Sequence, residues 1–111
     1  MPEIVRDYMP YTLDAVRLLG QLIKRKRKEK RMPAAELAER CGISRNTLNR
    51  IEQGSPKCEI GIVFEAATII GVRLFDLEDN RMKRYVREQE EILELMPKSI
   101  RDNIEDDDDD F

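Results

Sequence analysis

The stretch from Pro33 to Gly54 restricts the fold of this 111-residue chain more than any other. Its letters, PAAELAERCGISRNTLNRIEQG, predict two short helices joined by a tight turn. Pro33 suits a first helical position, where the N–H that proline lacks would have no partner. Gly42 ends the first helix because glycine tolerates a positive φ. Ser44 suits the N-cap of the second helix, which Gly54 ends.

Apolar spacing divides these two helices into inner and outer faces. The predicted inner residues are Leu37, Ala38, Cys41, Leu48 and Ile51. The second helix carries on its outer face Arg45, Asn46, Asn49 and Arg50. Arginine can donate two hydrogen bonds to guanine, and asparagine can pair bidentately with adenine. The pattern fits DNA recognition, but an αα-hairpin with a solvated polar side has the same spacing.

The flanking sequence distinguishes these two interpretations. Leu19–Val72 resembles the XRE family of helix-turn-helix domains, the lambda/434 repressor and Cro group. The resemblance is carried by LGQLIKRKRKEKRM, AAELAERCGISRNTLNRIEQG and EIGIVFEAATIIGV. It implies that the first helix of the motif braces the second, which enters the major groove. The expected DNA-binding residues are Ser44, Arg45, Asn46, Thr47, Asn49, Arg50 and Lys57.

Ser44 and Lys57 are the two candidates for phosphate contacts among these residues. The resemblance implies that Ser44 touches the DNA backbone. Lys57, in the turn after the second helix, is interpreted either as a phosphate contact or as an ordinary surface lysine.

The resemblance also implies a structural ion pair and one departure from the family pattern. Members often pair an Arg of the first helix with the Glu before the closing Gly, which here are Arg27 and Glu52. Members commonly carry a Gln near the start of the next helix as a phosphate clamp. This chain has Ala34 there, and its side chain cannot make that contact. We therefore expect lower affinity, or phosphate contacts from backbone and lysines.

Charge is unevenly distributed along the chain, whose net charge is −3. Residues 23–57 hold eleven Lys or Arg against four Asp or Glu, whereas the remainder holds nine against nineteen. Residues 24–31, KRKRKEKR, are either a solvated helix end or a site of phosphate contact and steering. A basic patch beside an acidic remainder predicts two surfaces with different partners.

Composition argues against several classes of protein. The chain has no His, and it shows no nucleophile with a base, no Gly-rich phosphate loop and no metal cluster. We expect no enzyme activity, no cofactor and no metal. Cys41 and Cys58 are expected to be free thiols. No signal peptide is visible, and no apolar run approaches the roughly 20 residues of a membrane span, so we expect a cytoplasmic protein.

The expected fold is all-α: a five-helix, lambda-repressor-like helix-turn-helix domain, a C-terminal helix and a disordered acidic tail. The parts are an N-terminal arm (1–11), the helix-turn-helix domain (12–78), the C-terminal helix (79–97) and the tail (98–111). Thr12 is the expected N-cap of the first helix. A short fifth helical turn is expected over 74–77. The fourth helix is expected to bury Ile60, Val63, Phe64, Ala67 and Ile70.

The C-terminal helix carries an apolar stripe with two interpretations. The stripe either folds onto its own domain or forms a dimer seam, in which Gln89 would set the register. We favour a homodimer because two-fold repressors read two half-sites. The tail, with five aspartates and Phe111, either solubilises the chain, binds a basic partner or competes with DNA for the basic patch.

These features predict a sequence-specific DNA-binding transcriptional regulator that binds double-stranded DNA at an inverted-repeat operator. Small size, an acidic tail and the lack of a ligand domain make the chain similar to HipB-like antitoxins. Such antitoxins pair with HipA-like kinase toxins and repress their own operon, although the sequence after Leu77 departs from the β-strand dimerisation piece expected of HipB. The alternative is a protein-interaction adaptor that kept the helical fold and no longer binds DNA.

Overall fold

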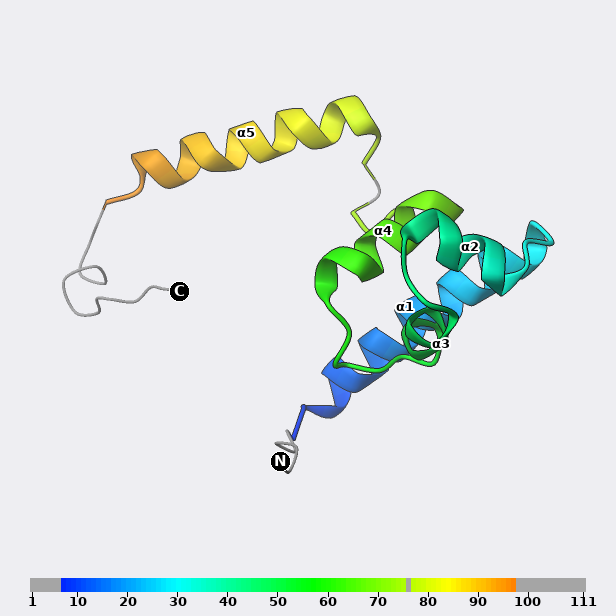
Figure 1. Ribbon diagram of the computed structural model, residues 1–111. Helices are drawn as coiled ribbons and strands as arrows, with labels where there is room; N and C mark the ends of the chain where they lie inside the picture. Colours follow the sequence, from blue (N-terminus) through cyan, green and yellow to red (C-terminus); the bar gives the residue numbers. More distant parts are fainter. Residues whose placement is uncertain (1–6, 76, 98–111) are drawn as a thin grey trace. The chain divides into compact units, whose positions relative to one another are not determined.

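The structure, a computed structural model, describes residues 7–75 and 77–97. Those residues form helices and connecting segments and contain no strand, so the predicted all-α fold is confirmed (Figure 1). The chain divides into two units, residues 1–75 and 76–111. The helices are α1 (Pro10–Glu29), α2 (Ala34–Cys41), α3 (Arg45–Glu52), α4 (Ile60–Ile70) and α5 (Asp79–Leu95).

The first unit is built around one small core. Both α1 and α2 pack against α3 and α4. Each of the four helices contributes one fully buried large side chain, and these are Ile23, Leu37, Leu48 and Ile70. Burial of such a side chain is worth roughly 1.5–3 kcal/mol. The predicted inner residues Ala38 and Ile51 are also buried, and Cys41 is half-buried.

The first helix begins earlier than predicted. Its N-cap is Met9 and its first residue is Pro10, so the prediction that Thr12 caps the helix is wrong. Proline explains the difference, because its fixed φ suits the first helical turn and its missing N–H leaves no donor unsatisfied. Tyr11 therefore lies in the helix. The start of the predicted arm, residues 1–6, lies outside the described residues.

The end of the first unit differs from prediction in two places. Ile60 was expected in the core but is 73% exposed, because it is the first residue of α4. The buried residues of α4 lie further along the helix and are Ala66, Ala67 and Ile70. The predicted helical turn over 74–77 is not among the described helices. Leu74 and Phe75 instead form a bend, and residue 76 lies outside the described residues. The rings of Phe64 and Phe75 stack with centroids 6.2 Å apart, which holds this bend against α4.

The second unit contains the C-terminal helix that the sequence predicts. α5 runs from Asp79 to Leu95, and none of its residues is buried. The predicted acidic tail, residues 98–111, lies outside the described residues. Of the helices that the structure describes, none is both long and apolar enough to cross a lipid bilayer.

Candidate nucleic-acid interface

α3 presents a polar outer face because its inner face is occupied by the core. Leu48, Ile51 and Glu52 are buried. Since successive helix residues are about 100° apart, the remaining positions turn toward solvent. The exposed residues of this outer face are Arg45, Asn46, Asn49 and Arg50. The four polar side chains are therefore uncovered and share one short helix.

The turn before α3 fixes the point at which the helix begins. Gly42 has φ 71°, a conformation that residues with a Cβ rarely adopt, and its N–H donates to the carbonyl of Glu39 at 3.0 Å. Ser44 is extended and caps α3, because its Oγ accepts a hydrogen bond from the Thr47 N–H at 3.0 Å. The sequence predicted this glycine turn and this cap, and both are present.

Thr47 has a different environment from the exposed residues beside it. It is half-buried, and its Oγ1 accepts a hydrogen bond from the Ser44 hydroxyl at 3.0 Å. Ser44 itself is exposed at the helix N-terminus, where free backbone N–H groups favour an anion. Thr47 is thus better placed to hold Ser44 than to reach a base.

A hollow of about 430 Å³ lies beside the outer face of α3. Its lining residues come from α1, α2 and α3, and they are Lys24, Arg27, Ala34, Arg45, Asn46, Leu48, Asn49 and Glu52. The exposed Lys24 brings a cation to the same hollow as the first turn of α3. Ala34 contributes only a methyl group, as the sequence implied. Sequence reasoning included Lys24 in a basic run but could not single it out.

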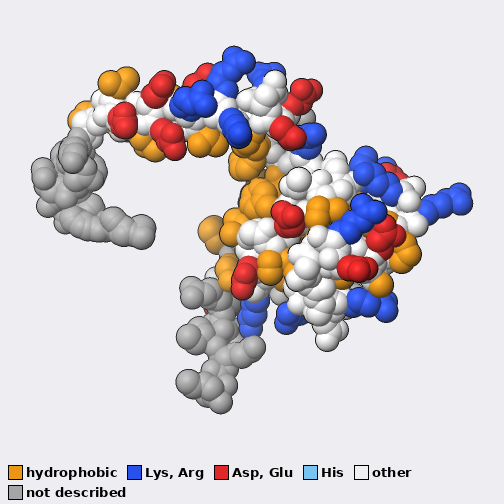
Figure 2. All heavy atoms as spheres, turned by 45° about the horizontal axis from the view of Figure 1, so that its top comes forward, with side chains coloured by type: hydrophobic (Ala, Val, Ile, Leu, Met, Phe, Trp, Pro, Cys, Tyr) orange, Lys and Arg blue, Asp and Glu red, His pale blue; other side chains and the backbone are white. Residues whose placement is uncertain are grey.

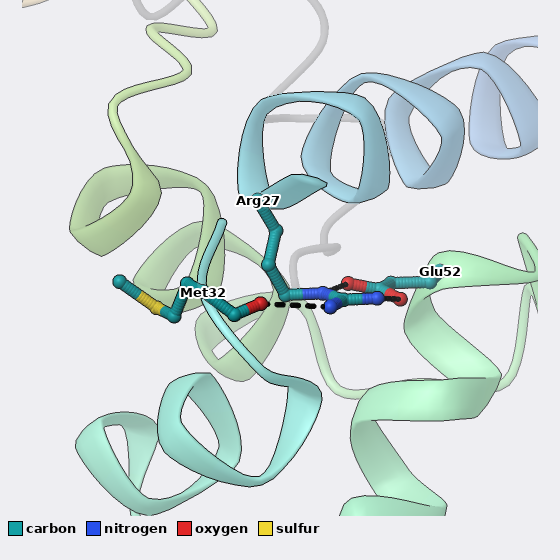
Figure 3. Close-up of polar contacts among 3 residues, drawn as sticks. All are labelled: Arg27, Met32 and Glu52. Atoms are coloured by element: carbon teal, nitrogen blue, oxygen red, sulfur yellow. Dashed lines mark hydrogen bonds and ion pairs between the residues drawn. The ribbon is translucent and has the colours of Figure 1, made fainter. Parts of the chain in front are cut away.

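The buried ion pair joins α1 to the end of α3 (Figure 3). Arg27 Nε donates to Glu52 Oε2 at 2.7 Å, and its Nη2 donates to Glu52 Oε1 at 3.0 Å. Its Nη1 donates to the carbonyl of Met32 at 2.9 Å. One guanidinium therefore fastens α1, α3 and the loop before α2. The resemblance pointed to the Arg27–Glu52 pair, whereas the contact with Met32 was not foreseen.

Burial makes this pair sensitive to the loss of either member. The side chains of Arg27 and Glu52 are 10% and 5% exposed. Hydrogen bonding to Glu52 and the charge of that carboxylate raise the pKa of Arg27, while burial acts in the opposite direction. The arginine stays charged, so removal of either partner would leave the other charge unpaired in a dry site.

A close helix contact at Gly20 sets the distance between α1 and α3. A Cβ at this position would meet the carbonyl oxygen of Ile51 and would lie 2.8 Å from that of Glu52. Only glycine lets the backbones approach this closely. Gly20 is buried in the middle of α1, where nothing in the local pattern marks it as a packing residue.

The basic residues of the run 24–31 have different roles in the structure. Lys24 lines the hollow, Arg27 is buried in the ion pair, and Arg25 pairs with Glu29 on the surface. Lys30 Nζ donates to the carbonyl of Ile70 at 2.8 Å and so caps the C-terminus of α4. Lys and Arg side chains are spread over the visible face of the first unit with carboxylates among them (Figure 2).

Lys57 lies in the loop between α3 and α4, apart from the residues that line the hollow. It is exposed, and its backbone N–H donates to Ser55 Oγ at 3.3 Å. The loop therefore presents one basic residue near the end of α3. A phosphate contact by Lys57 stays a prediction.

The two cysteines are free and half-buried. Burial, with a smaller contribution from the charge of Glu65, raises the pKa of the Cys41 thiol. Cys41 thus remains a neutral thiol at physiological pH and acts as a small apolar residue.

Two short helices joined by a glycine turn, the second with a capped N-terminus and a polar outer face, define the helix-turn-helix class of DNA-binding domain. Residues 23–77 match the family model described as Helix-turn-helix. Through this domain the chain belongs to the XRE-type helix-turn-helix family, and it is a DNA-binding transcription regulator. No curated protein and no solved structure gives a significant match to the chain.

Proposed function

We propose that this regulator recognises a specific DNA sequence through the outer face of α3. The observation that supports this proposal is the exposure of Arg45, Asn46, Asn49 and Arg50 on one short helix whose other side is buried. Arginine and asparagine match the hydrogen-bonding edges of guanine and adenine in the major groove. These four residues would supply sequence selectivity.

Phosphate contacts would come from groups around this face. Ser44 lies at the exposed N-terminus of α3, with Thr47 holding its hydroxyl. Lys24 lines the adjoining hollow, and Lys57 follows in the next loop. Such contacts position a protein on DNA without reading its sequence, and they make affinity dependent on salt.

Alanine substitution tests the separation between base and phosphate contacts. Arg45→Ala or Arg50→Ala should weaken binding to a selected best site by roughly 1–3 kcal/mol, with little effect on random DNA. Lys24→Ala should weaken both about equally. Arg25→Ala is the matched control, because Arg25 is also an exposed arginine but pairs with Glu29 and does not line the hollow. An equal loss of affinity for selected and random DNA would show that Arg45 and Arg50 do not read bases.

The second candidate function is a protein-interaction adaptor, and Ala34 is the observation that favours it. Ala34 lines the hollow where family members commonly carry a phosphate-clamping Gln. Ala34→Gln should tighten DNA binding if the face still meets a duplex. A mobility shift at two salt concentrations distinguishes the candidates. A steep salt slope with sequence preference supports the regulator, whereas no binding at low salt, in the native chain or in Ala34→Gln, supports the adaptor.

The narrower role that we propose is that of an autorepressing, cytoplasmic antitoxin that binds an inverted-repeat operator as a homodimer. The acidic remainder of the chain supports this role. A HipA-like kinase toxin would be the partner, held by the acidic residues 98–111, which lie outside the described residues. Co-expression with the neighbouring gene should yield a stable complex and relieve growth arrest. A gene with no toxic neighbour would contradict the antitoxin role.

A further inference from the structure

Arg31, in the loop between α1 and α2, has an unusual backbone conformation. Its φ is 57°, and in the part of the chain that the structure describes it is the one residue other than glycine with a positive φ. This left-handed region costs free energy for a residue with a Cβ, whereas glycine enters it freely. Elsewhere the chain uses glycine for a positive φ, at Gly42, Gly54 and Gly71. Arginine at this position therefore lowers stability relative to glycine.

The loop is fastened on both sides of Arg31. The N–H of Met32 donates to the carbonyl of Arg27 at 3.0 Å. The carbonyl of Met32 accepts a hydrogen bond from Arg27 Nη1 at 2.9 Å (Figure 3). On the other side, Lys30 Nζ donates to the carbonyl of Ile70 at 2.8 Å. Since both neighbours are anchored, the backbone of Arg31 is held in its strained conformation and a local shift cannot relieve it.

The side chain of Arg31 gains nothing from the rest of the described chain. It is exposed, and with the residues that the structure describes its guanidinium forms no hydrogen bond and no ion pair. Other arginines of the basic run are paired, Arg25 with Glu29 and Arg27 with Glu52. Strained residues persist where their surroundings fix them, and they cluster at functional sites. The cost at Arg31 is accounted for if its guanidinium binds an anion from outside the chain.

The position of Arg31 indicates which anion this is. Arg31 follows Arg27 by four residues and precedes Ala34 by three, and both of these residues line the hollow beside α3. Three residues span at most about 11 Å, so Arg31 lies within this distance of Ala34. With α3 in a major groove about 12 Å wide, one phosphate backbone of the duplex runs along the side of α3 that carries the hollow. The anions nearest to Arg31 would then be DNA phosphates.

We propose that Arg31 binds a phosphate of the DNA backbone and replaces the clamp that Ala34 cannot provide. The planar guanidinium donates two parallel hydrogen bonds to phosphate oxygens, a geometry that lysine cannot match. The anchored loop holds the arginine in place before DNA arrives, so less order is lost on binding. This inference rests on the function proposed for α3, because only a duplex docked on α3 brings its backbone past the loop.

The substitution Arg31→Gly should change stability and DNA binding in opposite directions. The melting temperature should rise by about 2–6 °C, because glycine relieves the left-handed strain. The affinity at low salt should fall about fivefold to tenfold, equally for a selected best site and for random DNA, because a phosphate contact carries no sequence information. The slope of log K against log salt should become shallower by about one. Thermal unfolding and fluorescence anisotropy with labelled duplexes measure these changes in the full-length chain.

Three controls separate the guanidinium from other effects of the substitution. Arg31→Asn should lose as much affinity as Arg31→Gly, because asparagine tolerates the left-handed conformation and has no charge. Arg31→Lys keeps the charge and the strain, so it should retain most of the affinity without a gain in melting temperature. Arg25→Ala removes an exposed arginine that pairs with Glu29, and it should bind DNA like the native chain.

The outcomes distinguish this proposal from the function proposed for α3. If the native chain binds DNA and Arg31→Gly binds it equally well, only the role of Arg31 is overturned. A lower melting temperature in Arg31→Gly would show that the side chain holds the loop, and a loss confined to the selected site would make Arg31 a base reader. Either result would also overturn the phosphate contact. A native chain that binds no DNA at low salt would contradict the function of α3, and the role of Arg31 with it.

Discussion

α3 and α5 are both polar helices, but α3 is anchored by buried side chains and α5 has none. α3 has eight residues, of which three are buried, and a serine cap, a glycine turn and a buried ion pair fix its ends. α5 has seventeen residues and buries none. Length contributes little to this difference, since the shorter helix is the better anchored one. The contrast teaches that the exposed side of α3 can serve as a reading surface because its other side is fixed.

The largest expected effect concerns the ion pair that anchors α3. Arg27→Met should lower the free energy of unfolding by about 3–5 kcal/mol, because Glu52 would remain buried without its partner. Urea denaturation of the first unit measures this change. Arg25→Ala is the control: it removes an ion pair whose members are 75% and 52% exposed, and should cost less than about 0.5 kcal/mol.

The double variant Arg27→Met/Glu52→Leu sharpens this prediction. Since it removes both charges together, it should be clearly more stable than Arg27→Met alone. A loss below about 1 kcal/mol in Arg27→Met would mean that packing alone anchors α3 and would weaken the contrast with α5.

The next effect concerns the close approach of α1 and α3. Gly20→Ala should destabilise the first unit by about 1–3 kcal/mol, because the new Cβ would overlap the carbonyl of Ile51. Gly61→Ala is the matched control, since a Cβ there meets no atom within 4 Å. This control should be neutral or stabilising by up to about 1 kcal/mol, because alanine favours a helix. Thermal unfolding compares them, and equal stability of the two variants would contradict the close contact.

A smaller effect is expected at the N-terminus of α3. Ser44→Ala removes the oxygen that caps the Thr47 N–H and should cost about 1 kcal/mol, whereas Ser44→Gly should cost only a few tenths. Amide hydrogen exchange by NMR should show faster exchange of the Thr47 N–H in Ser44→Ala. Unchanged protection of that amide would show that the first turn is fixed by packing rather than by its cap.

The smallest effect tests how far water is excluded from the Cys41 thiol. Its pKa is raised in the folded state, so the unfolded chain ionises first as the pH rises. Stability is therefore unaffected below the ordinary thiol pKa of about 8.5 and falls as the pH rises through the folded value. In Cys58→Ala, alkylation of Cys41 by iodoacetamide should begin at higher pH in the folded chain than in urea. Coincident pH profiles would show that the thiol is fully hydrated.

Much of α2 and α3 could be predicted because local chemistry determines it. Glycine at a left-handed position, serine at a cap and leucines at helical spacing each act within a few residues. The inner residues Leu37, Leu48 and Ile51 are buried as expected. The Arg27–Glu52 pair joins residues far apart in sequence, and only a resemblance to a known family pointed to it.

What the sequence could not reveal depends on distances between helices. The role of Gly20 follows from the separation of α1 and α3, and the contact of Lys30 with Ile70 follows from where α4 ends. Ile60 was expected in the core because it is apolar, but α4 begins there, ahead of its packed residues. Of the expected site residues, the role of Lys57 remains a prediction, as does every contact with DNA.

The separation of anchoring and outward residues on α3 has a consequence for protein engineering. Leu48, Ile51 and Glu52 hold the helix, and none of them is among its four outward polar residues. Selectivity can therefore be rewritten, by swapping the outward set for that of another regulator, without disturbing what keeps the scaffold folded. Most members of a library randomised at those four positions should keep the native melting temperature. The members should differ widely in the operator sequence that they prefer.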